Sequence, residues 1–121
     1  MTVREIKTVN SEIKHLIRKI NYLRDSAVNI SPSLSGDAVS GGSQDKIASV
    51  IAEITDCEHK LSRLRAYRNY HLDKLSKDND IEYCIWLHLA RNYSWRKIAV
   101  TTDGRPDTAE SIRKRCYRHK W

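Results

Sequence analysis

The residues best suited to a specific chemical role are basic and lie near the C-terminus of this 121-residue sequence. After Pro106, apolar side chains recur at Ala109, Ile112 and Cys116, a spacing that predicts one buried helix face. The opposite face would be polar and would hold Glu110, Lys114, Tyr117 and Arg118, with Arg113 and Arg115 on its flanks. Arginine and lysine donate hydrogen bonds to guanine edges, and glutamate can accept one from cytosine. This pattern predicts a helix that enters the major groove of duplex DNA.

More candidate contacts precede this helix in the chain. Two basic side chains follow Ser94, and another follows the turn dipeptide Asp103-Gly104. Flanking cations of this kind position a protein on phosphates and do not read sequence. The predicted DNA-binding residues are Arg96, Lys97, Arg105, Thr108, Glu110, Ser111, Arg113, Lys114, Arg115, Tyr117 and Arg118.

Three short helices are predicted to position these side chains within residues 80–121. The first covers 81–91 and has an apolar face. The second covers 95–100, is capped by Ser94 and buries Ile98 and Ala99. Residues 101–106 are predicted to form a loop, and Asp107-x-x-Glu110 has the pattern of a capping box that starts the last helix. The layout is that of a helix-turn-helix unit.

Residues 1–76 are predicted to form a long helical hairpin. Apolar residues follow a heptad pattern over 3–30, which opens with the capping box Thr2-x-x-Glu5 and is expected to stop at Ser31-Pro32. A second stripe covers 45–76, after a Gly/Ser linker at 31–44. The predicted fold is therefore all-α, with an antiparallel hairpin followed by the helix-turn-helix unit. Pairing with a second chain is the competing arrangement, and a four-helix homodimer could combine both.

The charge distribution is consistent with a polyanionic partner. The net charge is +7, and residues 81–121 hold nine Lys and Arg against four Asp and Glu. No stretch is apolar enough to span a membrane, and no signal-peptide core follows the N-terminus. Three cysteines without a CxxC motif suit a reducing compartment, so a cytoplasmic protein is expected.

Catalysis and metal binding have little support in the sequence. No nucleophile elbow, phosphate-binding loop or paired carboxylates occur. Cys84-x-x-x-His88 and Cys116-x-x-His119 have spacings that zinc ligands could use, but both cysteines fall on apolar stripes, where a free cysteine usually packs as a small hydrophobe. We expect no enzyme, no metal and no cofactor.

The stretch from about Ile81 to Arg118 resembles the helix-turn-helix of sigma-factor region 4. Ser94-Trp95-x-x-Ile98-Ala99 and the run Ser111 to Arg118 provide the match. The whole layout is similar to small phage and prophage late-transcription regulators of the ArpU-like and RinA-like type. This resemblance implies a DNA-binding transcription regulator that binds a promoter and contacts RNA polymerase.

Ala99 and Ile112 are farther apart than in the sigma-like pattern, which leaves either an enlarged turn or a variant unit like that of the Myb family. Two other functions stay open. One is a phage protein that binds and inhibits a host complex, such as RNA polymerase or a nucleic-acid-guided defence nuclease. The other is a small terminase subunit, although that protein usually has its DNA-binding unit first.

Overall fold

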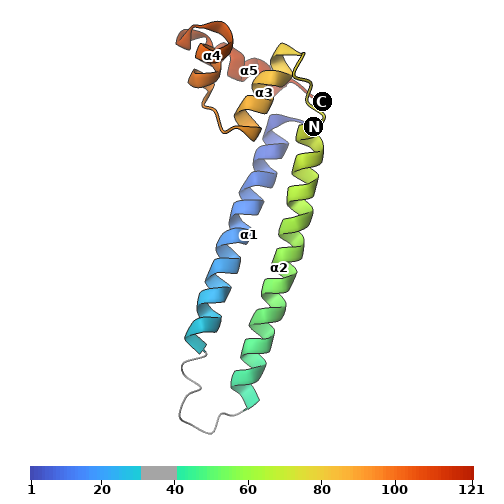
Figure 1. The fold of residues 1–121 in the computed structure, drawn as a ribbon, viewed down its shortest axis with the longest axis vertical. Coiled ribbons are helices and arrows are strands. Elements are labelled where there is room, and N and C mark those ends of the chain that lie inside the picture. The colour runs from blue at the N-terminus through green and yellow to red at the C-terminus, as the bar shows by residue number, and fades with distance from the viewer. Residues whose placement is uncertain (31–40) are drawn as a thin grey trace. The chain divides into compact units, whose positions relative to one another are not determined.

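The computed structural model describes residues 1–30 and 41–121, with side chains for residues 1–28 and 45–121. These residues form helices and turns and contain no β-strand. In chain order the elements are α1 (Val3–Ile30), α2 (Gly41–Asp73), α3 (Asp80–Ala90), α4 (Trp95–Asp103), the short 3₁₀ turn η2 (Pro106–Thr108) and α5 (Ala109–Arg118) (Figure 1). The predicted all-α class is confirmed, with a long hairpin followed by a small helical unit. None of the described helices is both long and apolar enough to cross a membrane.

The chain divides into two compact units. The first contains Met1–Asn10 together with Ala66–Trp121, and the second contains Ser11–Arg65. This division passes through both long helices, whereas the sequence pattern predicts a boundary between residues 76 and 80. The start of α1 and the end of α2 therefore belong to the same unit as the three short helices.

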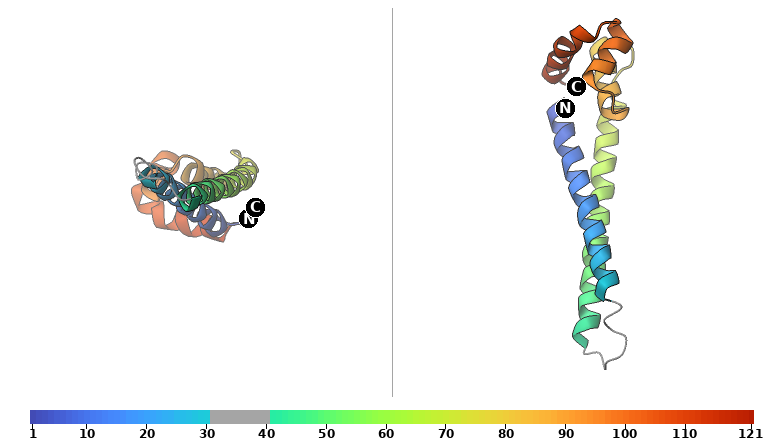
Figure 2. Two further views of the ribbon diagram at one scale, coloured as in Figure 1. Left: turned by 90° about the horizontal axis from the view of Figure 1, so that it is seen from below. Right: turned by 90° about the vertical axis from the view of Figure 1, so that its left-hand side faces the viewer.

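The second unit is a pair of antiparallel helix segments that lie side by side (Figures 1 and 2). Its buried side chains come from the two predicted stripes: Ile13, Ile20, Leu23, Cys57 and Leu61. Each helix covers the apolar stripe of the other, as the heptad spacing predicts. Two exposed ion pairs, Lys19–Glu53 at 3.4 Å and Arg24–Glu58 at 2.7 Å, join the segments and contribute little stability because solvent screens them.

The long helices begin and end close to the predicted positions. The capping box of α1 is confirmed, because the Thr2 amide donates to Glu5 Oε2 at 3.2 Å and the Glu5 amide donates to Thr2 Oγ1 at 3.3 Å. The predicted stop at Ser31-Pro32 and the linker residues 31–40 lie outside the described residues. The rest of the predicted linker, 41–44, is helical instead, since glycine and serine weaken a helix without preventing it next to a long apolar stripe.

The core of the first unit joins distant parts of the chain. Val3 and Ile6 from α1 pack with Leu72 and Leu75 and with buried side chains of the three short helices: Cys84, Ile85, Leu87, Ile98 and Cys116. The indole of Trp121 donates a hydrogen bond to the His71 carbonyl at 2.7 Å. The core of the three short helices is thus completed by the start of α1 and the end of α2.

Two predictions about the short helices are wrong. Residues 101–103 extend α4 instead of forming a loop, and Gly104 ends the helix with φ of +70°, a conformation that glycine adopts without strain. The Asp107 capping box does not form, because η2 precedes α5 directly and the Ala109 amide donates to the Pro106 carbonyl. The predicted Ser94 cap is confirmed, with the Lys97 amide donating to Ser94 Oγ at 3.1 Å.

Candidate nucleic-acid interface

Helix α5 presents an apolar face to the core of the first unit and a charged face to solvent. Cys116 is buried and Ile112 is half-buried against the core. Several of the predicted groove-facing side chains are exposed: Glu110, Ser111, Lys114 and Arg118. Lys114 and Arg118 are one turn apart, so they share one stripe of the helix surface. The outward direction predicted for Glu110, Lys114 and Arg118 agrees with the structure.

Tyr117 is the exception on this helix. Its side chain is half-buried and packs against the core instead of pointing outward. The phenol oxygen accepts a hydrogen bond from Lys7 Nζ at 2.6 Å, and the ring lies 6.1 Å from that of Trp95. A large ring placed near two other helices is held by packing, which the angular position on an isolated helix does not reveal. Tyr117 therefore joins α5 to α1.

The start of α1 adds basic side chains to the face of α5. Lys7 Nζ lies 5.1 Å from the centre of the Tyr117 ring, and the guanidinium carbon atoms of Arg113 and Arg4 lie at 5.5 and 5.8 Å. Three cations therefore surround one aromatic ring. Tyr117 also lines an open cleft of about 390 Å³, which we call the basic cleft, together with Thr2, Arg4, Arg113, Lys114 and Arg118.

The basic cleft is positively charged, because Glu110 neutralises only one of the four cations that line it. No acidic residue lines it. The nearest counter-charge on α5 is Glu110, whose carboxylate accepts two hydrogen bonds from the Arg113 guanidinium. These hydrogen bonds lower the pKa of Glu110 and raise that of Arg113. Arg4, Lys114 and Arg118 form no ion pair within the described residues, so an anion in the cleft would be attracted by their charge.

Other predicted contacts lie outside the basic cleft. Arg96 and Lys97 are exposed on α4, where the Lys97 ammonium lies 4.0 Å from the centre of the Tyr93 ring. Arg105 is exposed in the turn after α4, and Thr108 is half-buried and donates to the Arg105 carbonyl at 2.9 Å. Arg115 lines a different cleft, between α3, α4 and α5. Of the predicted set, Arg113, Lys114, Tyr117 and Arg118 share the basic cleft, and Glu110 forms an ion pair with Arg113.

The ring of His88 on α3 contacts Tyr93 and Trp95. Its Nδ1 lies 2.7 Å from the Tyr93 carbonyl, which can only accept, so this nitrogen is the protonated one. The imidazole stacks on Trp95 with ring centres 3.9 Å apart. Burial is the largest cause of a lowered His88 pKa, with the positive charge of Lys7 acting in the same direction and the hydrogen bond to Tyr93 opposing it. His88 is therefore held by stacking on Trp95 and by its hydrogen bond to the Tyr93 carbonyl.

Three residues at the start of the chain were not among the predicted contacts: Thr2 and Arg4, which line the basic cleft, and Lys7, which donates to Tyr117. Thr2 was predicted only as a helix cap, and Arg4 and Lys7, in the first two turns of a predicted coiled-coil helix, indicated only a solvated charged face. The one sequence signal was that the apolar positions of this helix begin at Val3 and Ile6, next to these cations. Only the tertiary packing of that end of α1 beside α5 makes them neighbours of Tyr117.

Comparison with known proteins does not assign the chain to a family. No protein-family model matches the sequence, and no curated protein or solved structure matches it significantly.

Proposed function

We propose that this protein is a sequence-directed, double-stranded DNA-binding transcription regulator of phage origin. The observation that supports this most strongly is the basic cleft, which Arg4 of α1 lines together with Lys114 and Arg118 of α5, without an acidic lining residue. In this proposal α5 enters the major groove, and the cations beside it contact phosphates. Contact with RNA polymerase is part of the same proposal and rests on the resemblance to late-transcription regulators.

If α5 lies in the major groove, its exposed side chains contact different parts of the DNA. Lys114 is central on the outward face and is the candidate for a base contact. Arg118 is one turn later and is the candidate for a phosphate contact. Removal of a base-reading lysine costs about 1–3 kcal/mol for the preferred sequence and relaxes the preference, whereas removal of a phosphate contact weakens all sequences alike.

The test is a titration of selected and scrambled duplexes at several salt concentrations. Wild type should bind more weakly as salt increases, Lys114→Ala should lose discrimination, and Lys14→Ala should be unchanged, because Lys14 is exposed on α1 in the other compact unit. If wild type shows no salt-dependent duplex binding, the transcription proposal fails. A single stoichiometric host protein recovered without DNA would then favour a protein inhibitor.

We further propose that the protein acts as a homodimer in the cytoplasm of its bacterial host. The hairpin leaves large apolar side chains on its surface, with Tyr22 71%, Val28 66% and Ile51 54% exposed. Burial of apolar area is the main favourable term in association. Light scattering at tens of micromolar protein should report two chains per particle, and a monomer both with and without DNA would contradict the proposal.

A further inference from the structure

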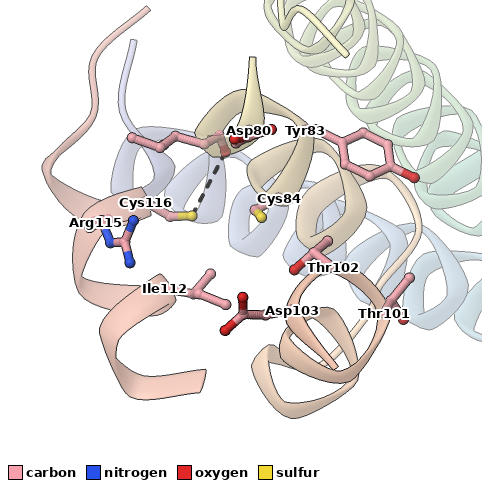
Figure 3. Close-up of a pocket in the computed structure, with 10 residues that line it drawn as sticks. Asp80, Tyr83, Cys84, Thr101, Thr102, Asp103, Ile112, Arg115 and Cys116 are labelled. Atoms are coloured by element: carbon pink, nitrogen blue, oxygen red, sulfur yellow. Dashed lines mark hydrogen bonds between the residues drawn. The ribbon is translucent and has the colours of Figure 1, made fainter. Parts of the chain in front are cut away.

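A second cleft in the first unit contains two thiols and is not used by the proposed DNA contacts. This cleft measures about 420 Å³ and lies between α3, α4 and α5. Cys84 from α3 and Cys116 from α5 line it together with Thr102, Asp103 and Arg115. Figure 3 shows both sulfur atoms within this cleft, on facing helices. The thiols therefore border an open space, although the side chains of Cys84 and Cys116 are only 7% and 1% exposed.

The packing of α3 against α5 holds the two thiols near each other. Cys116 Sγ donates a weak hydrogen bond to the Ile81 carbonyl at 3.9 Å (Figure 3). Ile81 is three residues before Cys84 on the same helix, so this contact directs the Cys116 sulfur toward the turn that holds Cys84. The third cysteine, Cys57, is buried in the hairpin stripe of the other compact unit and has no thiol neighbour there.

The surroundings favour a thiolate at one of the two positions. The neighbouring Cys116 thiol is the largest cause that lowers the pKa of Cys84, to about 7, and the nearby Thr102 hydroxyl acts in the same direction. Burial and the carboxylate of Asp80 oppose this shift, while the positive charge of Arg115 supports it. The same thiol contact and burial raise the pKa of Cys116. The lowered pKa makes Cys84 the better nucleophile of the two thiols that line the cleft.

We propose that Cys84 and Cys116 form an oxidisable dithiol, which a peroxide converts into an intramolecular disulfide between α3 and α5. In the first step the Cys84 thiolate attacks one peroxide oxygen, the O–O bond breaks, and hydroxide leaves when the peroxide is hydrogen peroxide. Cys84 is then a sulfenic acid. In the second step the Cys116 sulfur attacks the Cys84 sulfur, the S–O bond breaks, and the Cys116 proton leaves with the hydroxyl group as water. Two cysteine sulfurs are oxidised and one peroxide is reduced.

The disulfide would link the candidate reader helix α5 covalently to α3 across the core of the unit. Because the link closes a long loop of the unfolded chain, the oxidised protein should unfold at a higher urea concentration than the reduced protein. This inference does not depend on DNA binding and is tested without it.

The experiment uses the full chain, first reduced and then freed of reductant. Hydrogen peroxide is added in small molar excess at pH 7.5, the reaction is quenched, and the remaining thiols are alkylated in denaturant. Intact-mass and peptide analysis should show the loss of two hydrogen atoms, a peptide pair joined through Cys84 and Cys116, and an alkylated Cys57. Wild type alone is sufficient for this measurement, so it does not rely on a variant that folds.

Two variants sharpen the result. Cys57→Ser should form the same disulfide at the wild-type rate. Cys116→Ser should stop at the first step and yield a sulfenic acid on Cys84 that dimedone traps. The proposal is overturned if all three thiols stay alkylatable after oxidant, if Cys57 is oxidised as fast as Cys84, or if the disulfides join two chains.

Discussion

Replacement of Arg4 by alanine tests whether the start of α1 belongs to the DNA-binding surface. Arg4 is exposed, lines the basic cleft and lies 5.8 Å from the centre of the Tyr117 ring. If its guanidinium contacts one phosphate, DNA binding releases about 0.9 fewer counterions in the variant. The slope of log affinity against log salt should therefore become less steep by about 0.9. At about 0.1 M monovalent salt this corresponds to an affinity about eightfold lower, and the loss should shrink toward 1 M.

The assay is fluorescence anisotropy of a labelled duplex at four salt concentrations, with the preferred sequence and a scrambled one. Both sequences should weaken by the same factor, because a phosphate contact carries no sequence information. Arg4→Lys keeps the charge and should retain most of the slope. Arg18→Ala is the matched control, since Arg18 is exposed on the same helix in the other compact unit. Equal behaviour of Arg4→Ala and Arg18→Ala would refute the assignment of α1 to the interface.

Three other predictions concern stability and electrostatics. Ile6→Ala should lower the free energy of unfolding by about 2–5 kcal/mol, because Ile6 is fully buried in the core of the first unit. Val100→Ala should change it by about 0.5 kcal/mol or less, because Val100 is 49% exposed in the same unit, and equal urea midpoints for the two variants would contradict this. Glu110→Ala frees the Arg113 guanidinium and should tighten binding to scrambled duplexes while lowering discrimination, and weaker binding to every duplex would argue against it. Burial lowers the pKa of His88 in the folded protein below its usual value of 6.5, so the unfolded chain binds this proton more readily than the folded chain. The contribution of neutral His88 to the free energy of unfolding is therefore fully present above pH 6.5 and is lost as the pH falls through the lower pKa of the folded state. His88→Asn keeps a donor for the Tyr93 carbonyl and should flatten this pH dependence in thermal melts, whereas an unchanged dependence would exclude His88 as its source.

Local pattern was sufficient for the helices and for many of their ends. Heptad spacing predicted the buried positions Ile13, Ile20 and Leu61 because each helix has one face that must leave water. Side-chain caps were equally readable, as at Thr2 and Ser94, since a cap depends on residues a few positions apart. The predicted Asp107 cap of α5 was wrong because the short turn η2, with its hydrogen bond from the Ala109 amide to the Pro106 carbonyl, precedes the helix and no side chain caps it.

The composition and spacing of the sequence by themselves determined the all-α class, the hairpin and the basic outward stripe of α5. Only the tertiary structure decided that the start of α1 and the end of α2 complete the core of the C-terminal unit. It also turned Tyr117 inward, placed Arg4 and Lys7 around it, and paired Cys84 with Cys116 across two helices. The physical reason is that periodicity records which face of a helix avoids water, but not which distant helix covers that face. Contacts between residues more than a hundred positions apart depend on that choice of partner.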